Sequence, residues 1–580
     1  MKKYKPYVRK YWYCFILGPL FMILEASGEF ILPLINKNMV DIGAANGDME
    51  FILKNGVYML LLAIAMMITG VLGANFAIRG AAHLAAGVRR DTFDRIQTFS
   101  FSNIDDFSTG SLITRITNDV TQIQTFTQTL LRGFFRSPVM LIGALIMSFI
   151  LNPKLALIIL VAVPVLGFVT YLIIKTASPR YTTMQEKLDA LNTNIGESIT
   201  NERVIKSFVR EEHEKKKFSL VNSTLMKKSV AALKLMITMM PLSMLFVNGT
   251  TVAVVWFSGK QIMVGDMEIG TLMAFITYLT QVLTALNFLA NIALQGTRAA
   301  ASDRRISEVL NTVPDIRDDD AVQKERVISS GEIEFRNVGF RYFKKNREPV
   351  LENVSLRIGS GELVGIIGST GSGKTTLVSM IPRLYDPDEG EVLVDGVDVR
   401  QLSLFHLRES VAMVLQKNTL FSGTIEENLR WGNENAEKEE IVAAAKIAQA
   451  DDFIRSFPNG YQTELGQGGT NLSGGQKQRL CIARALLKKP KILILDDSTS
   501  AVDTATDAKI RKAFREQLAG TTKIIIAQRI SSVMDADKII VLDGGKVVAC
   551  GVHADLIKTC TAYQEIYYSQ KDREEAAVHG

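Results

Sequence analysis

The sequence predicts an all-α membrane domain of six transmembrane helices with long cytoplasmic helical extensions, fused to an α/β domain. Long runs of Leu, Ile, Val and Met fill the first half of the 580-residue chain, whereas charged residues dominate the second half. A single hydrophobic core stops growing at about 250 to 300 residues, so at least two units are expected. From Gly331 onward, short β-branched runs alternate with helical patterns, which is typical of an α/β sheet.

Six stretches contain about 20 mostly apolar residues, enough for a helix to cross a bilayer. They are approximately residues 13–35, 56–78, 135–152, 155–176, 235–257 and 270–295. The basic residues before the first stretch resemble the start of a signal peptide. That stretch is long, carries Glu25 and Glu29, and precedes further spans, so we expect it to remain as the first transmembrane helix.

Clusters of Lys and Arg fall on one side of these spans, at the amino terminus, near residues 79–95 and near residues 206–217. The positive-inside rule makes that side the cytoplasm, which predicts a multi-pass protein of the cell membrane with a cytoplasmic amino terminus and a cytoplasmic second domain. Basic ends facing anionic lipid explain the net charge of +6, so the lipid bilayer is an expected partner and nucleic acid is not. The four cysteines lack CxxC spacing, which indicates neither a zinc site nor a disulfide framework.

Two cytoplasmic connections, near residues 79–134 and 177–234, carry apolar residues at helical intervals. A descending and a returning helix of about 25 residues each would reach about 40 Å beyond the bilayer; a separate cytoplasmic subdomain is the alternative. The expected organisation is a transmembrane domain over residues 1–310, a linker over 311–330 with an acidic run at 318–320, a second domain over 331–570 and a tail over 571–580.

Four apolar runs are predicted strands: 363–367, 491–495, 523–526 and 538–542. A phosphate-binding loop follows the first of them. Its residues are Gly368, Ser369, Thr370, Gly371, Ser372, Gly373, Lys374 and Thr375, with Thr376 next. In such a loop the backbone N–H groups cradle phosphates, the lysine reaches the β- and γ-phosphates, and the Thr375 hydroxyl faces Mg²⁺. Asp496, at the end of another apolar strand, is placed to hold Mg²⁺ through water. These motifs alone predict a P-loop NTPase that binds a nucleoside triphosphate with Mg²⁺.

A pentapeptide narrows the class, because Leu472, Ser473, Gly474, Gly475 and Gln476 resemble the signature motif of ATP-binding cassette (ABC) proteins. The order of six spans, two long connections and a cassette resembles one half of an ABC exporter. The resemblance implies that Tyr342 stacks on adenine, that Gln416 senses Mg²⁺, and that Ser500 and Asp503 belong to a loop between two ATP sites. It also implies a second exporter half as partner, because each ATP lies between one chain's phosphate loop and the other's signature.

Two residues depart from the family pattern. Asp497 stands where a glutamate normally activates water, which leaves its carboxylate about 1.5 Å short, and a misplacement of that size can cost about 10²-fold in rate. Gln528 stands where a histidine normally contacts the γ-phosphate, and an amide cannot become an imidazolium. The pattern resembles heterodimeric multidrug exporters with one degenerate site. It predicts a slow site in this chain and an intact signature that completes the partner's catalytic site.

Polar residues inside the spans are candidates for a substrate cavity. Glu25 and Glu29 lie on one helical face, which suggests a water-filled path or a cationic ligand. The alternative is that helix–helix hydrogen bonds satisfy them or that they lie near the outer interface. In the sixth span Asn287, Asn291 and Gln295 repeat every four residues, and Gln281 and Thr284 lie nearby. This polar stripe would line a central cavity, with interhelical packing as an equal alternative. The cytoplasmic segments 101–107 and 208–212 resemble the tips that dock on cassettes.

The expected function is ATP hydrolysis that drives export of amphipathic drugs or lipids from the cytoplasm or the inner leaflet. Two alternatives remain open. One is a homodimeric lipid or peptide exporter, which the paired losses of glutamate and histidine argue against. The other is an ATP-gated channel or regulatory subunit, which the intact signature argues against.

Overall fold

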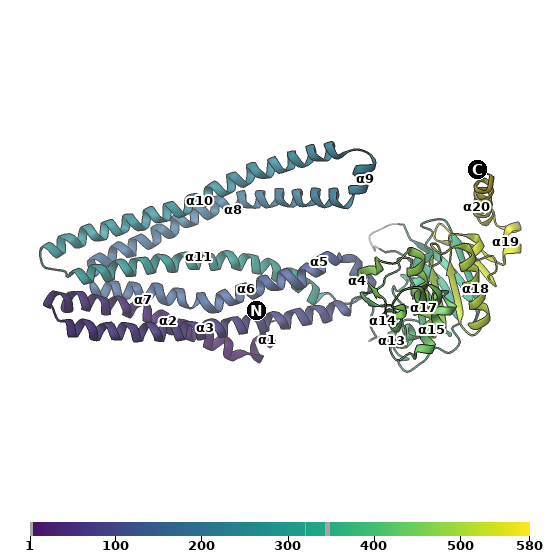
Figure 1. Ribbon diagram of the computed structural model, residues 1–580, viewed down its shortest axis with the longest axis horizontal. Helices are drawn as coiled ribbons and strands as arrows, with labels where there is room; N and C mark the ends of the chain where they lie inside the picture. Colours follow the sequence, from purple (N-terminus) through teal and green to yellow (C-terminus); the bar gives the residue numbers. More distant parts are fainter. Residues whose placement is uncertain (1–3, 319–320, 343–347, 580) are drawn as a thin grey trace. The chain divides into compact units, whose positions relative to one another are not determined.

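The chain forms two units in a computed structural model that describes residues 4–318, 321–342 and 348–579 (Figure 1). The helical unit contains Met1–Ile96 and Gly110–Thr312, and the sheet unit contains Gln97–Thr109 and Val313–Gly580. The sheet unit therefore includes a segment from the first cytoplasmic connection, because the short helix α4 (Phe101–Asp106) packs against it. The predicted tail continues helix α20 (Thr561–His579), and residues 319–320 of the predicted acidic run lie outside the described residues.

The helical unit consists of long helices interrupted by short π-helical turns (Figure 1). Its elements are α1 (Lys5–Lys10), α2 (Trp12–Asn38), η2 (Met39–Ala44), α3 (Met49–Gln97), α5 (Thr109–Thr114), η3 (Arg115–Asp119), α6 (Val120–Thr129), η4 (Leu130–Phe134), α7 (Arg136–Leu151), α8 (Pro153–Thr200), α9 (Glu202–Ser207), α10 (Glu211–Met263) and α11 (Ile269–Asn311). Among the described residues, four helical segments are long and apolar enough to cross a membrane: Trp12–Ala44, Met49–Gln97, Thr109–Leu151 and Ile269–Asn311. The predicted spans 155–176 and 235–257 lie within α8 and α10.

The cytoplasmic connections are continuous helical extensions of the spans, as the sequence predicted. Helix α3 runs on to Gln97, and α8 and α10 lie side by side with α9 between them in the chain (Figure 1). A side-chain cap explains the tight turn before α8, because the Asn152 Oδ1 accepts hydrogen bonds from the N–H groups of Lys154 and Leu155. The second predicted tip, residues 208–212, lies between the short helix α9 and the first residues of α10.

The sheet unit is built on a six-stranded sheet in the order β12-β11-β3-β10-β9-β6. The strands are β3 (Leu363–Gly368), β6 (Val411–Val414), β9 (Ile492–Asp496), β10 (Thr522–Ile526), β11 (Lys538–Asp543) and β12 (Lys546–Gly551). All neighbours are parallel except β11 and β12. The four strands predicted from sequence are β3, β9, β10 and β11.

A second, antiparallel sheet has the order β2-β1-β4-β5. It contains β1 (Ile333–Phe340), β2 (Leu351–Ile358), β4 (Glu389–Val394) and β5 (Val397–Asp398), and a two-stranded ribbon joins β7 (Gly423–Thr424) to β8 (Glu464–Leu465). The remaining helices are α12 (Lys374–Ser379), α13 (Leu404–Ser410), α14 (Ile425–Arg430), α15 (Lys438–Ile447), α16 (Asp451–Ser456), α17 (Gly474–Leu487), α18 (Thr504–Gln517) and α19 (His553–Thr559).

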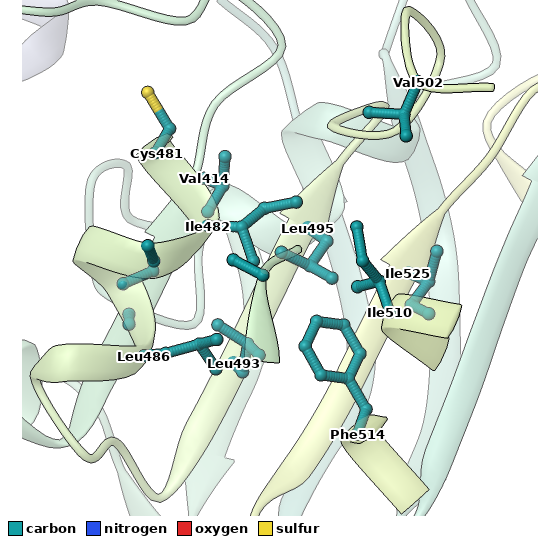
Figure 2. Close-up of a cluster of buried hydrophobic side chains, with 14 of the residues drawn as sticks. Val414, Cys481, Ile482, Leu486, Leu493, Leu495, Val502, Ile510, Phe514 and Ile525 are labelled. Atoms are coloured by element: carbon teal, nitrogen blue, oxygen red, sulfur yellow. The ribbon is translucent and has the colours of Figure 1, made fainter. Parts of the chain in front are cut away.

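An apolar core fixes the carboxyl ends of the central strands. Figure 2 shows Ile482 and Leu486 of α17 and Ile510 and Phe514 of α18 beside the strand residues Leu493 and Leu495 of β9 and Ile525 of β10. Phe514 and Leu493 are fully buried. Because close packing leaves these strands little freedom, the residues that follow their ends are held in defined positions.

Candidate functional site

The predicted phosphate-binding loop joins strand β3 to helix α12. Gly371 and Gly373 have φ angles of +85° and +91°, in the left-handed region that favours glycine. A Cβ at Gly368 would lie 2.0 Å from the carbonyl oxygen of Leu542, so this position admits no side chain. Glycine at these positions therefore lets the turn bring backbone N–H groups toward one point at the start of α12.

Lys374 lies inside this turn. Its Nζ donates hydrogen bonds to the carbonyl oxygens of Gly368 at 2.9 Å and Ser369 at 2.7 Å. Burial lowers the pKa of the Lys374 ammonium, and the nearby carboxylates of Asp496 and Asp497 oppose that shift. A half-buried cation beside convergent N–H groups is an arrangement that binds a phosphate group.

Asp496 is the last residue of β9 and is 2% exposed. Its Oδ2 accepts a hydrogen bond from the Thr375 hydroxyl at 2.8 Å. Burial raises the pKa of the Asp496 carboxyl, and the hydrogen bond from Thr375 is the largest effect that lowers it. A hydroxyl and a carboxylate in contact offer the oxygen ligands that Mg²⁺ prefers, so these residues fit the ion.

Three predicted residues meet at the ends of neighbouring strands. Gln416 follows β6, Asp497 follows β9 and Gln528 follows β10. The Gln528 Nε2 donates to the Asp497 Oδ2 at 2.8 Å, and the Gln416 side chain also hydrogen-bonds this carboxylate. Burial raises the pKa of the Asp497 carboxyl, and the hydrogen bond with Gln416 is the largest opposing effect. Asp497 and Gln528, the two residues that depart from the family pattern, are therefore hydrogen-bonded to each other.

The backbone at Asp497 is constrained as well. Its φ angle is +48°, a value that few residues other than glycine adopt. Its N–H donates to the carbonyl oxygen of Ile526 at 3.0 Å, which holds the turn against β10. Strained backbone of this kind persists where the surrounding structure fixes it, and it is common at functional sites.

Tyr342 lies close to the phosphate-binding loop. Its hydroxyl forms a hydrogen bond with the Thr376 hydroxyl at 2.9 Å, and its ring meets Phe340 and Tyr385 edge to face. The side chain is 41% exposed, which leaves part of the ring accessible to a planar base.

The predicted signature begins helix α17. The Ser473 Oγ accepts from the Gln476 N–H at 3.3 Å, and the Gln476 Oε1 accepts from the Ser473 N–H at 2.9 Å, which forms a capping box. A Cβ at Gly475 would lie 2.7 Å from the carbonyl oxygen of Ala501, so glycine allows the loop containing Ser500 and Asp503 to approach. Asp503 caps α18 by accepting from the Thr506 N–H at 2.9 Å, and this bond lowers the pKa of the Asp503 carboxyl.

Comparison with known proteins identifies the family. The family model of the ABC transporter transmembrane region matches residues 15–286, and that of the ABC transporter matches residues 351–500. The uncharacterized ABC transporter ATP-binding protein YfiB of Bacillus subtilis is 38% identical over 99% of both chains. The chain belongs to the ABC transporter family.

Other ABC proteins refine this assignment. An ATP-dependent lipid A-core flippase of Syntrophus aciditrophicus is 34% identical over 84% of this chain and 80% of its own. The structure of a bacterial Atm1-family ABC exporter with ATP bound has a TM-score of 0.80 and 26% identity, and the match covers 97% of this chain and 98% of that chain. The protein is thus an ATP-driven ABC exporter, integral to the membrane, with a cytoplasmic nucleotide-binding domain.

The structure of this ABC exporter gives both predicted membrane carboxylates a common partner. The Arg136 Nε donates to the Glu25 Oε2 at 2.9 Å, and its Nη2 donates to the Glu29 Oε1 at 2.5 Å. Hydrogen bonds between helices thus engage both carboxylates, and the Glu29 Oε2 is buried without a hydrogen-bond partner among the described residues. Arg136 itself was missed, although a cation inside the predicted span 135–152 was a usable signal.

Of the polar residues predicted in the sixth span, Gln281 contacts the helix that carries these carboxylates. The Gln281 Nε2 donates to the Glu29 carbonyl oxygen at 2.8 Å, and the Gln281 Oε1 is buried without a hydrogen-bond partner among the described residues. Asn291 is exposed, and the side chain of Asn287 lies outside the described part of the structure.

Two glutamines in the cassette were also missed by sequence reasoning. Gln478, on α17, accepts from the Ala501 N–H at 3.0 Å and donates to the Ser500 hydroxyl at 3.3 Å, so it ties the signature helix to the loop between the sites. Gln570, on α20, donates to the Gln528 carbonyl oxygen at 2.7 Å and accepts from the Ile530 N–H at 2.9 Å. Neither contact has a local sequence pattern, because the partners lie more than 20 residues away.

Proposed function

We propose that this chain is one half of a heterodimeric exporter, and that its own ATP site turns over slowly while its signature completes the partner's site. The observation that carries the proposal is the 2.8 Å hydrogen bond between the Gln528 Nε2 and the Asp497 Oδ2. A general base needs a free oxygen within hydrogen-bond reach of the attacking water. In this chain that carboxylate is one methylene short and one of its oxygens accepts from an amide.

The remaining site residues support ATP binding without fast hydrolysis. Lys374 and the glycine turn hold the phosphates, and the Tyr342 ring offers a surface for adenine. Thr375, Asp496 and Gln416 would hold Mg²⁺, which neutralises phosphate charge when bound. With these groups intact, slow turnover follows from Asp497 and Gln528 alone, and long ATP occupancy would keep the two cassettes in contact.

The need for a second half is supported by apolar side chains beyond the predicted spans. Ile199, Phe208 and Val209 are exposed by 71%, 72% and 81% near the cytoplasmic turn between α8 and α10. Lipid does not reach this part of the helical extension. Clusters of exposed apolar residues outside a membrane mark protein contacts, and a partner's cassette is the natural cover.

The proposed substrates are amphipathic drugs or lipids that leave the cytoplasm or the inner leaflet. Glu25, Glu29 and Arg136 place two carboxylates and one guanidinium within the membrane, which leaves one negative charge in excess. Such a group favours an amphiphile with a cationic part, and it would lie at the level of the lipid chains.

A homodimeric lipid exporter is the second candidate, favoured by the lipid A-core flippases among the relatives. Co-purification separates the two. The tagged chain is extracted from its native membrane in mild detergent, and the accompanying chains are identified by mass. Heterodimerisation predicts a stoichiometric, different exporter half with glutamate and histidine at the positions of Asp497 and Gln528; a homodimer with brisk ATP hydrolysis would contradict the proposal.

A further inference from the structure

The helical unit contains an apolar cavity of about 880 Å³, apart from the polar residues singled out within the spans. Its walls come from α1, α2, α3, α6, η4 and α11, and include Phe15, Leu84, Phe126 and Leu130. The volume lies within the range of about 300 to 1,000 Å³ that is usual for sites of small ligands.

Every wall of this cavity lies at the cytoplasmic end of a predicted span. Phe15 is at the start of the first span, and Leu84 follows the end of the second. Leu130 precedes the third span, and Ala300 follows the sixth. The cavity therefore sits at the cytoplasmic boundary between hydrocarbon and water, where the head groups of anionic lipids concentrate.

Two basic side chains line the cavity. Lys5 and Arg9 both line it, and their spacing of four residues puts them on one face of α1. Among the described residues, neither cation forms an ion pair with a carboxylate. Asp303 also lines the cavity and accepts a hydrogen bond from the Tyr4 hydroxyl, so the two cations outnumber the carboxylate.

Helix α1 is fixed in place rather than being a free basic tail. The Tyr4 hydroxyl donates to Asp303 on α11, and the Tyr7 hydroxyl donates to Asp91 on α3. Tyr4, Tyr7 and Val8 pack against a buried cluster that includes Leu84 and Ile123. This packing holds Lys5 and Arg9 over the apolar walls, so the site is formed before a ligand arrives.

We propose that the cavity binds an anionic phospholipid of the cytoplasmic leaflet as a resident ligand. Its phosphate lies at Lys5 and Arg9, and one acyl chain lies along Phe15, Phe126 and Leu130. Each basic residue near an anionic membrane surface contributes about 1 kcal/mol, which is about fivefold in affinity. The lipid joins α1 to α3, α6 and α11 and stabilises their packing.

Native mass spectrometry of the full transporter tests this assignment. The probes are palmitoyl-oleoyl phosphatidylglycerol and the corresponding phosphatidylcholine, titrated into delipidated protein. We expect one tightly bound phosphatidylglycerol per chain, a loss of about 25-fold in affinity on combining Lys5→Ala with Arg9→Ala, and weak binding of phosphatidylcholine. Lys10→Ala is the matched control, because Lys10 is on the same helix but lies over the Tyr11 ring at 5.8 Å and does not line the cavity.

A second variant tests the apolar part without changing charge. Ala300→Leu places a larger side chain on the exposed wall, and it should reduce phosphatidylglycerol binding while the thermal unfolding of the lipid-free protein stays the same. Equal retention of phosphatidylglycerol by the charge variant and the wild type would overturn the proposal. So would equal affinity for phosphatidylcholine, or a bound lipid that leaves with each ATP turnover, which would make the cavity a transport site.

Discussion

At the residue scale, Asp497 is bound by Gln528 through one of the oxygens that a water-activating carboxylate would present. The Gln528 Nε2 lies 2.8 Å from this oxygen, and the φ angle of +48° fixes the direction of the Asp497 side chain. Asp497→Glu alone would lengthen the acid but leave the Gln528 amide in place. Restoring only the histidine would leave the carboxylate short, so the two residues should be changed together.

Asp497→Glu combined with Gln528→His should raise ATP turnover at this chain's site by about 10- to 100-fold, because a positioned general base contributes at least that much. The measurement is steady-state ATP hydrolysis by the assembled transporter in which the partner's catalytic glutamate has been removed. Asp535→Glu is the control, since it lengthens a carboxylate that pairs with Arg511 away from the site. Unchanged turnover in the double variant would show that Asp497 and Gln528 do not limit the rate of ATP hydrolysis at this site.

The Gln570 side chain holds the backbone around Gln528 in position, and its removal tests whether that position affects ATP release. Gln570→Ala removes two hydrogen bonds to this backbone, at 2.7 Å and 2.9 Å, each with a net contribution of about 1 kcal/mol. ATP should therefore dissociate from this chain several-fold faster. The check is the release rate of labelled ATP from transporter trapped with Mg²⁺ and ATP.

Gln564 supplies the matched control for this experiment. It is on the same helix, but its Nε2 donates to the Ile557 carbonyl oxygen at 2.8 Å, away from the nucleotide. Gln564→Ala should release ATP at the wild-type rate. If both variants release ATP equally fast, the effect belongs to the stability of α20 and not to the position of Gln528.

The nucleotide residues could be predicted from sequence because each motif is local, with its spacing set by one turn or one strand end. Lys374, Thr375 and Asp496 lie where the motifs placed them. Gln478, Gln570 and Arg136 could not be predicted in the same way. Their contacts depend on tertiary packing between distant segments, such as Arg136 with Glu25 at a separation of 111 residues.

At the scale of elements, α4 links the first cytoplasmic connection to the cassette fold. The Tyr385 hydroxyl donates to the Asp105 Oδ2 at 2.7 Å, and the Tyr385 ring lies 6.1 Å from that of Phe101. The same ring lies 5.3 Å from that of Tyr342, the residue proposed to face adenine. Tyr385 thus contacts both α4, which lies between the second and third predicted spans, and Tyr342.

Tyr385→Phe should keep the ring contacts and remove the hydrogen bond to Asp105. A hydrogen bond to a charged group contributes about 1.5 to 3 kcal/mol, so transport per ATP should fall about tenfold while basal ATP hydrolysis changes little. Transport into inverted vesicles and ATP hydrolysis are measured on the same preparation. Tyr461→Phe is the control, because it loses a 2.7 Å bond to Asp451 that does not involve α4. A parallel fall in both activities would contradict this role.

Hydropathy and residue spacing were sufficient to predict the long helices, since a span must be apolar and its extension must bury one face. The π-helical turns η2, η3 and η4 could not be foreseen, because they depend on how neighbouring helices pack. The allocation of residues 97–109 to the sheet unit was also missed. It follows from contacts such as that of Asp105 with Tyr385, which connect segments 280 residues apart.

For the whole molecule, a slow site in this chain means that the chain retains ATP while the assembled exporter consumes it. The geometry of Asp497 and Gln528 concerns only this chain's phosphate loop. If each ATP lies between one chain's phosphate loop and the other chain's signature, Ser473 to Gln476 serve the ATP that the partner's phosphate loop holds. Two chains with different roles should therefore show different fates for the nucleotide that each one holds.

Photolabelling with 8-azido-ATP measures those fates directly. The purified transporter is loaded with the γ-labelled or the α-labelled nucleotide, chased with unlabelled ATP during turnover, irradiated, and its chains are separated. If the site of this chain is slow, this chain keeps both the γ and the α label through many turnovers, whereas the partner loses both labels within a few turnovers. Loss of the γ label from this chain at the overall rate of ATP hydrolysis would show that Asp497 activates water efficiently and would contradict the slow site.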